Sequence, residues 1–268
     1  GWGGNSSYGG GKWIETPTST PKFIRTPDGK VLQGVTFIAG GDNNLLLKVD
    51  PDGDGLGDAY SVGTYNGRGG GLGAQEYYAE PVLLYMDETQ DGMKQGPGDP
   101  LTNIRMLAAG DAAGFAVDGI TGYVYAWGEN GGNGRCGLPY AADYLYAAQM
   151  VAGDYQRISN ESYLTNVKEV VGGNGWGAAI TNEGYMLYWG KNNDPTFATW
   201  GGTVPDPDFS GQGTNSADAT IVYNGVIQPH KNGPVFAKYE DNSIVDNAVH
   251  LGRGDLFGFM SNSEDKYF

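Results

Sequence analysis

Residues 122–130 read Gly122-Tyr123-Val124-Tyr125-Ala126-Trp127-Gly128-Glu129-Asn130, and residues 184–192 repeat the pattern as Gly184-Tyr185-Met186-Leu187-Tyr188-Trp189-Gly190-Lys191-Asn192. In both stretches a glycine precedes a short run of apolar and aromatic residues, which is typical of a β-strand that follows a tight turn. Glycine is abundant in the whole chain, at 47 of 268 residues, and no stretch shows the periodicity of a long helix. The repeated stretch therefore predicts an all-β protein built from copies of one unit.

Four apolar segments that each contain a glycine mark the starts of four copies. They are Phe37-Ile38-Ala39-Gly40, Leu107-Ala108-Ala109-Gly110, Val170-Val171-Gly172-Gly173 and Val249-His250-Leu251-Gly252. Seven residues after the last glycine of each segment comes an apolar residue, namely Leu47, Val117, Ile180 or Phe259. This spacing predicts a second strand in each copy, with side chains that alternate between two faces.

The two ends of the chain look like the halves of one further Trp-Gly element. The chain begins Gly1-Trp2-Gly3-Gly4-Asn5 and ends Lys266-Tyr267-Phe268. Read from the end into the start, these residues rebuild the pattern. We therefore expect Trp2, Gly3 and Asn5 to meet Tyr267 and Phe268 in one structural unit, either within one molecule or between neighbouring copies.

These segments resemble the repeats of the regulator-of-chromosome-condensation family. The family pattern is an apolar-x-x-Gly strand start followed by a hairpin and a Trp-Gly-x-Asn element, and residues 122–130 with Gly134 and Gly137 match it best. The resemblance implies a β-propeller of four-stranded blades whose last blade is completed by the N-terminal strand, which removes unpaired sheet edges. The family typically has seven blades, whereas this sequence supplies four copies, so we expect about four blades. The histidine that usually follows the strand-start glycine is missing from all four copies.

We expect one propeller domain over residues 1–268. Its repeats lie near residues 35–73, 104–138, 167–202 and 246–268 plus 1–11. Residues 74–100, 140–165 and 203–243 match no repeat and are expected to supply extra outer strands or to cover the rims of the blades.

The charge of the chain bears on its partners. The formal net charge is −15 and the isoelectric point is about 4.3. Binding to a phosphate backbone needs a basic face, so nucleic acid is not an expected partner. No apolar run approaches the roughly 20 residues that a membrane-spanning helix needs, so no membrane span is expected.

The stretch Asp50-Pro51-Asp52-Gly53-Asp54-Gly55-Leu56-Gly57-Asp58 fits the start of a calcium-binding loop. Calcium takes six to eight oxygen ligands. We expect Asp50, Asp52 and Asp54 to converge, Leu56 to offer its carbonyl, and Asp58 to bind directly or through water. The alternative is an acidic turn without a metal, because Asp, Gly and Pro all favour tight turns.

The tryptophans fall into two groups. Trp2, Trp127 and Trp189 stand at equivalent repeat positions, so we expect them to pack between blades. Trp176 and Trp200 fall outside that register. With Tyr144 they could form an exposed surface that binds a sugar or a protein, and packing in the core is the alternative.

The sequence carries no nucleophile elbow, zinc-protease motif or phosphate-binding loop, so we do not expect an enzyme. We expect a non-enzymatic structural or interaction module that binds proteins, including copies of itself. It would be a building block or adhesive part of an extracellular or viral assembly, joined by strand complementation between termini. The start at Gly1 and the style of the calcium loop favour an extracellular or surface-exposed location, with a virion component as the alternative. Two other functions stay open: a carbohydrate-binding or adhesion module, and a hydrolase with paired carboxylates on a propeller rim.

Overall fold

The computed structural model describes residues 20–41, 45–62, 80–87, 97–129, 135–138, 145–150, 152–190, 220–223, 226–229, 234–238, 243–253 and 258–262. The strands are β1 (Val35–Gly40), β2 (Leu45–Val49), β3 (Asp58–Val62), β4 (Val82–Leu83), β5 (Tyr85–Asp87), β6 (Pro97–Pro100), β7 (Ile104–Ala109), β8 (Ala113–Asp118), β9 (Val124–Gly128), β10 (Leu145–Gln149), β11 (Val167–Gly172), β12 (Trp176–Thr181), β13 (Met186–Gly190), β14 (Thr220–Tyr223), β15 (Val226–Pro229), β16 (Val235–Phe236), β17 (Ala248–Arg253) and β18 (Gly258–Asn262). Helical structure in this part of the chain is confined to a 3-10 turn, Gly153–Tyr155, and the helix α1 (Gln156–Ser159). The expected all-β class is confirmed.

The strands form sheets that follow one another along the chain. Their orders are β1-β2-β3-β4, then β6-β5-β10-β9-β8-β7, then β11-β12-β13-β16, with two-stranded sheets β14-β15 and β17-β18. We name four of these units: blade 1 (β1 to β4), blade 2 (β7 to β10), blade 3 (β11 to β13 with β16) and blade 4 (β17 and β18). Each of their first strands overlaps one of the four segments that the sequence marks as repeat starts.

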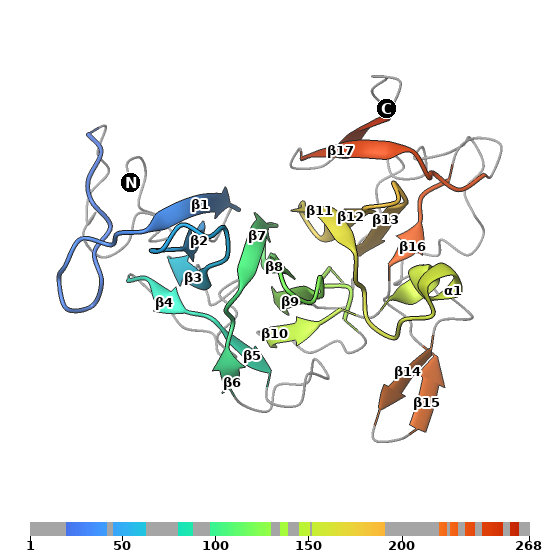
Figure 1. Ribbon diagram of the computed structural model, residues 1–268, viewed down its shortest axis with the longest axis horizontal. Coiled ribbons are helices and arrows are strands. Elements are labelled where there is room, and N and C mark those ends of the chain that lie inside the picture. Colours follow the sequence, from blue (N-terminus) through green and yellow to red (C-terminus); the bar gives the residue numbers. More distant parts are fainter. Residues whose placement is uncertain are drawn as a thin grey trace.

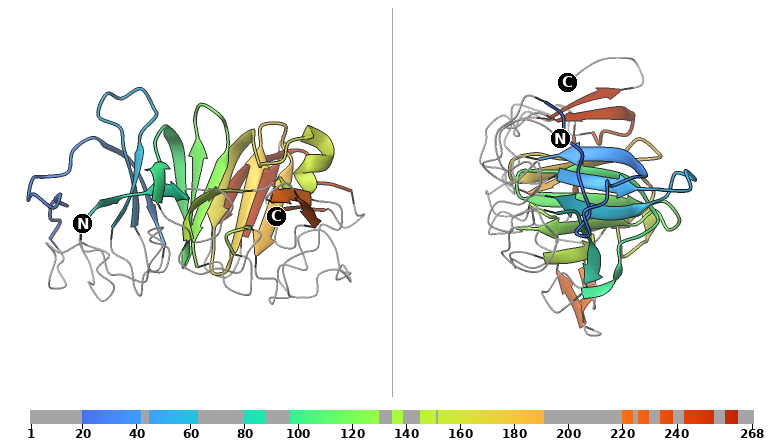
Figure 2. Two further views of the ribbon diagram at one scale, coloured as in Figure 1. Left: turned by 90° about the horizontal axis from the view of Figure 1, so that it is seen from below. Right: turned by 90° about the vertical axis from the view of Figure 1, so that its left-hand side faces the viewer.

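The blades stand side by side in the manner of a β-propeller (Figure 2, left). Figure 1 shows β1, β7, β11 and β17 around a common centre, with the arc open between β1 and β17. The described residues thus form an arc of propeller blades rather than a closed ring. A single domain over the whole chain stays a prediction.

The register of the first strands corrects the sequence alignment of the repeats. Each first strand has one irregularity against its second strand, at Thr36, Arg105, Lys168 and Val249. When the blades are aligned on this bulge, Val117 and Ile180 occupy the same position of the second strand. Leu47 is displaced from that position by one residue, and Phe259 is displaced by two. The hairpin is not the cause, because four residues separate the last paired residues in every blade. The glycines themselves fall at different positions of the strand end, so they are not a fixed marker of register.

The segments that match no repeat supply the outer strands, as expected. They contain β4, β10 and β16, which pair with the third strands of blades 1, 2 and 3. They also contain β5, which runs parallel to β10 through the pair Met86 and Ala147, and β6, which extends this sheet. Outer strands of two to five residues have no periodicity of their own, so the sequence did not reveal their positions.

Trp127 and Trp189 lie between blades, and this expectation is confirmed. Both side chains are at most 2% exposed. Each pairs across strands with a glycine, Gly114 for Trp127 and Gly177 for Trp189. A Cβ atom at Gly177 would lie 2.5 Å from the indole of Trp189, and one at Gly114 would overlap the indole of Trp127. The glycines are therefore needed for the rings to lie flat on the neighbouring strand.

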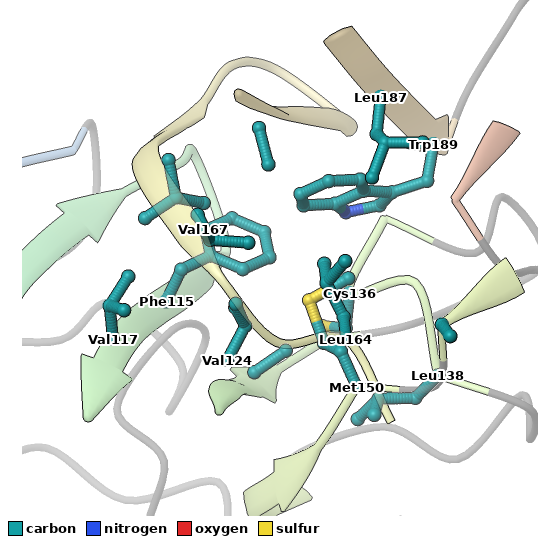
Figure 3. Packing of buried hydrophobic residues seen from close by; sticks show 14 of the residues in the cluster. Phe115, Val117, Val124, Cys136, Leu138, Met150, Leu164, Val167, Leu187 and Trp189 are labelled. Atoms are coloured by element: carbon teal, nitrogen blue, oxygen red, sulfur yellow. The ribbon is translucent and has the colours of Figure 1, made fainter. Parts of the chain in front are cut away.

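The core between blades 2 and 3 closes around Trp189 (Figure 3). Its ring meets Phe115 of blade 2 edge to face, with the centroids 5.5 Å apart. Leu138, Met150 and Leu164 belong to the same buried cluster. Such contacts between aromatic edges and faces add to the stability that buried area alone provides.

Replacement of Gly114 or Gly177 by alanine is expected to lower the free energy of unfolding by about 1–3 kcal/mol, because the added methyl group displaces a buried indole. Urea denaturation followed by tryptophan fluorescence measures the change. Gly40→Ala is the matched control, since a Cβ atom at this strand residue meets nothing within 4 Å. Equal stability of all three variants would contradict this account of the packing.

The residues expected to complete the last blade, Trp2, Gly3, Asn5, Tyr267 and Phe268, lie outside the described residues. Completion of that blade by the N-terminal strand stays a prediction. One described residue bears on it. Gly258 of β18 pairs with Arg253, at the register where Gly114 and Gly177 receive their tryptophans. A tryptophan on a third strand of blade 4 could therefore stack on Gly258, as Trp127 stacks on Gly114 and Trp189 on Gly177.

Deletion of residues 1–5 is expected to lower the melting temperature or to abolish self-association, because the deletion removes Trp2, the tryptophan that we expect to stack on Gly258. Differential scanning calorimetry and light scattering give the two readouts. Deletion of residues 6–10 is the control, since it has the same length and keeps the Trp-Gly element. A five-residue truncation with unchanged melting temperature and mass would refute terminal complementation.

Candidate functional site

The acidic turn, residues 50–57, joins β2 to β3 at one end of blade 1. Val49 pairs with Asp58, so the turn closes a regular hairpin. Asp52 and Asp54 are exposed at its tip, whereas Asp50 is 4% exposed at its base. The hairpin thus presents two carboxylates to solvent and buries a third.

The structure brings the first three predicted metal ligands together. One carboxylate oxygen from each of Asp50, Asp52 and Asp54 lies within 4.8 Å of the others. The two oxygens of Asp50 accept hydrogen bonds from the backbone N–H groups of Gly53, at 2.8 Å, and Gly55, at 3.1 Å. In the described part of the chain, these three aspartates form the one group of three or more His, Cys, Asp or Glu side chains arranged closely enough to share a metal ion.

A buried lysine lies beside the aspartates. The Nζ atom of Lys48 donates a hydrogen bond to the carbonyl of Gly55 at 2.7 Å, and Lys48 is 6% exposed. Burial alone would raise the pKa of Asp50. The N–H groups of Gly53 and Gly55, a hydrogen bond with Asp52 and the charge of Lys48 outweigh burial and hold that pKa below its ordinary value. Asp50 is therefore ionised at neutral pH and organises the turn.

The other two predicted ligands have other surroundings. Asp58 opens β3, outside the cluster of three, and burial raises its pKa. The side chain of Leu56 reaches blade 2, where it would overlap a Cβ atom placed at Gly119. Between them, Gly57 exchanges backbone hydrogen bonds with Ile104 at 3.0 and 2.8 Å. The base of the turn is thus fixed against blade 2 while its tip stays exposed.

Calcium binding by the acidic turn stays a prediction. Three carboxylates fit the oxygen preference of calcium but supply fewer than the six to eight ligands that it takes, so water or backbone oxygens would have to complete the shell. The hydrogen bonds of Asp50 and Lys48 equally suit the alternative, a turn that holds its shape without a metal.

If calcium binds as predicted, adding it to chelator-treated protein raises the melting temperature, and the variant with Asp52→Asn and Asp54→Asn loses this shift because two ligands are neutralised. Differential scanning fluorimetry measures both. Asp28→Asn is the control, since Asp28 is an exposed aspartate in a separate turn, paired with Lys30 at 2.6 Å. An unchanged melting temperature of the wild-type protein after calcium is added would refute the site.

The exposed aromatic surface is wrong for Trp176. This side chain is 3% exposed and packs in the cluster between blades 3 and 4 with residues that include Ile180, Val245 and Ala248. It begins β12, whose alternation turns it toward blade 4 rather than toward solvent. Trp200 and Tyr144 lie outside the described residues.

Two basic side chains that the sequence analysis missed connect successive blades. Arg105 and Lys168 occupy the bulge positions of blades 2 and 3. The guanidinium of Arg105 donates to the carbonyls of Val167 and, at 3.2 Å, of Lys168, and the Nζ atom of Lys168 donates to the carbonyl of Val249 at 2.8 Å. A bulge leaves backbone groups without a ladder partner, so these cations satisfy carbonyls of the next blade. The signal in the sequence was a basic residue five positions before Gly110 and before Gly173.

A carboxylate makes a similar connection between blades 3 and 4. Glu169 follows the bulge of blade 3, and its Oε1 lies 2.8 Å from Nδ1 of His250. Its Oε2 accepts the backbone N–H of Leu251 at 2.9 Å. The inner strands are thus joined by side chains that bond to the backbone of the following blade.

The glycine-rich stretch after β9 has a structural role where it is described. Arg135 lies 3.9 Å from Asp111 and 3.7 Å from Glu129, and its carbonyl accepts the indole N–H of Trp189 at 3.1 Å. The neighbouring Cys136 is buried, with its sulfur 3.2 Å from the carbonyl of Trp127. These contacts tie the stretch to blades 2 and 3.

None of the helices in the described ranges has the length and apolar character to cross a bilayer.

Comparison with known proteins finds similarity in fold alone. No protein-family model and no curated protein sequence matches the chain. Human WBSCR16 has a similar structure, with a TM-score of 0.61 and 15% identity, over 100% of this chain and 55% of that protein. Prp20p from Saccharomyces cerevisiae, described with its binding to Gsp1p and histones, has a TM-score of 0.54 and 14% identity, over 98% of this chain and 48% of that protein. Yeast RCC1 (Prp20) bound to Kap60 has a TM-score of 0.55 and 12% identity, over 93% of this chain and 45% of that protein. The chain spans about half the length of these structures.

The comparison corrects the expected location. An extracellular, surface-exposed or virion location is wrong, because the similar structures include a yeast protein described with histones, which are proteins of the cell interior. The start at Gly1 and the style of the acidic turn were weak grounds, since both reflect local sequence and neither is a targeting signal.

Proposed function

We propose that this chain, an arc of regulator-of-chromosome-condensation-type repeats, is a non-enzymatic module that binds proteins. The repeat type follows from the sequence pattern and from the fold shared with WBSCR16 and Prp20p. The observation that carries the proposal is that two of the similar structures are described with protein partners, namely Gsp1p, histones and Kap60. Those partners belong to those proteins. What the likeness supports here is the class of function.

The charge of this chain favours a basic partner. A net charge of −15 on 268 residues attracts cationic segments over a distance and repels acidic ones. Histones, named with Prp20p, are basic proteins of this kind. The partner that we propose is therefore a lysine- or arginine-rich protein segment.

The acidic turn is the contact surface that the geometry supports best. Asp52 and Asp54 are exposed, and the base of the turn is held by Asp50, by Lys48 and by the pairing of Gly57 with Ile104. A fixed base means that a partner meets two carboxylates whose positions are already set, so little ordering entropy is lost on binding.

Fluorescence anisotropy with a labelled decamer of lysine tests the proposal, with a decamer of glutamate as the control peptide. We expect binding of the lysine peptide at low salt, and weaker binding as salt is added. The variant with Asp52→Asn and Asp54→Asn should bind about 2- to 30-fold more weakly, since each exposed charge contributes about 0.2–1 kcal/mol. Asp28→Asn should bind like the wild type. Lysine-peptide binding that equals glutamate-peptide binding, or that ignores the double substitution, would overturn the proposal.

A further inference from the structure

The turns that join the second and third strands of blades 1, 2 and 3 lie along one edge of the arc, the upper edge in Figure 2, left. The turn of blade 1 is the acidic turn, and its Leu56 contacts the turn of blade 2 at Gly119. In the turn of blade 2, Tyr123 meets Tyr163, which precedes blade 3, with the ring centroids 5.9 Å apart. Blades 1, 2 and 3 thus share a continuous surface at this edge.

The same surface continues to blade 4. Asn166, which directly precedes β11, donates a side-chain hydrogen bond to Glu183 in the turn of blade 3. The next residue, Gly184, packs against the segment that leads into blade 4, since a Cβ atom there would lie 2.6 Å from the carbonyl oxygen of Asp246. We name the exposed and half-buried side chains along this line the turn surface, and they are Asp52, Asp54, Ile120, Tyr163, Glu183 and Asp246.

The middle of the turn surface is apolar. Asp118, the acidic residue of blade 2, is 8% exposed, and its carboxylate accepts the backbone N–H groups of Ile120 and Thr121, both at 2.7 Å. Ile120 is instead 68% exposed. A single exposed apolar side chain is common on proteins, but this one shares its turn with Tyr123, which contacts the ring of Tyr163. Such rings offer apolar area together with a polar tip, which suits contact with a protein.

The two ends of the turn surface are acidic. Asp52 and Asp54 are exposed at one end, and Glu183 and Asp246 are exposed at the other. The carboxylate of Glu183 is held in place, because it also accepts the hydroxyl of Tyr155 at 3.3 Å. Carboxylates therefore stand on both sides of the apolar middle.

Three basic side chains near this edge are turned to the backbone. Lys48 donates to the carbonyl of Gly55, Arg105 to those of Val167 and Lys168, and Lys168 to that of Val249. Their hydrogen-bonding capacity is used within the arc. The charges that the turn surface presents to a partner are those of its carboxylates.

We propose that the turn surface binds a basic protein segment with an apolar centre, in which one or two apolar residues are flanked on both sides by lysine or arginine. One basic end lies against Asp52 and Asp54, the apolar centre covers Ile120, and the other basic end lies against Glu183 and Asp246. Opposite charges meet at both ends, and apolar surface is buried between them. This inference rests on the proposed function, because it keeps the acidic turn as a contact, and it adds the apolar centre and the second acidic end.

The distance across the turn surface sets the length of the segment. Packed sheets lie about 10 Å apart, so the three steps from blade 1 to blade 4 span about 30 Å. An extended chain covers about 3.3 Å per residue, so about ten residues reach from one acidic end to the other. A decapeptide therefore matches the surface.

Two decapeptides of identical composition test the apolar centre by fluorescence anisotropy. In one, two leucines stand between two runs of four lysines, and in the other the two leucines precede all eight lysines. We expect the peptide with central leucines to bind at least about 3-fold more tightly, because only this order lets the leucines cover Ile120 while both basic ends meet carboxylates. Ile120→Ser should abolish this preference and leave binding of the lysine decamer unchanged, since Ile120 is exposed and carries no charge.

The variant with Glu183→Gln and Asp246→Asn tests the second acidic end. It should bind the peptide with central leucines about 2- to 30-fold more weakly, because two exposed charges are lost from the contact. The matched control carries Asp28→Asn and Asp99→Asn, which change the net charge equally at exposed aspartates outside the turn surface, and it should bind like the wild type.

Three outcomes would each overturn the inference: equal affinities of the two leucine peptides, an unchanged preference in Ile120→Ser, or equal affinities of the two double variants. The proposed function survives these outcomes if the lysine decamer still binds and its binding depends on Asp52 and Asp54. Absence of binding by the lysine decamer overturns the proposed function and this inference together.

Discussion

The contact on which the arc depends is the stacking of an indole on a glycine of the neighbouring strand. In blades 2 and 3, Gly114 and Gly177 remove the side chain that would stand between the strand and the ring. Trp127 and Trp189 then fill the space between blades, and aromatic and aliphatic groups of both blades close around them. One indole thus fills the space between blades 1 and 2, and a second fills the space between blades 2 and 3.

The bulge in each first strand is the second constraint, and it is polar. A bulge beside a core would leave carbonyls without partners, at a cost of about 1–3 kcal/mol each. Arg105 and Lys168 meet this demand from the bulge of the preceding blade. The apolar core therefore determines how far apart the blades lie, while the cations and Glu169 fix how each blade is aligned along the next.

The sequence revealed the features that are local. Strand starts, Trp127, Trp189 and the acidic turn each follow from residues close together in the chain, and the structure has them where the pattern predicts. Register did not follow, because Gly40, Gly110 and Gly252 fall at different distances from the bulge, which is invisible in the sequence. Outer strands did not follow either, since they are short and distant in sequence from the strands they pair with. The sequence left open whether Trp176 is exposed or packs in the core, because its burial depends on contacts with blade 4, far along the chain.

One connection on the outer edge changes what the repeats are. Leu84 alone separates β4 of blade 1 from β5, which joins the sheet of blade 2, and it is fully buried, with backbone bonds of 2.8 Å to Ala59 and Leu101. In most repeat proteins each unit meets its neighbour only across one face. Here backbone pairing at the outer edge joins the sheets of two blades as well. Blades 1 and 2 are thus joined by backbone pairing at the outer edge as well as by the core between them, so loss of either blade would leave backbone groups of the other without their partners.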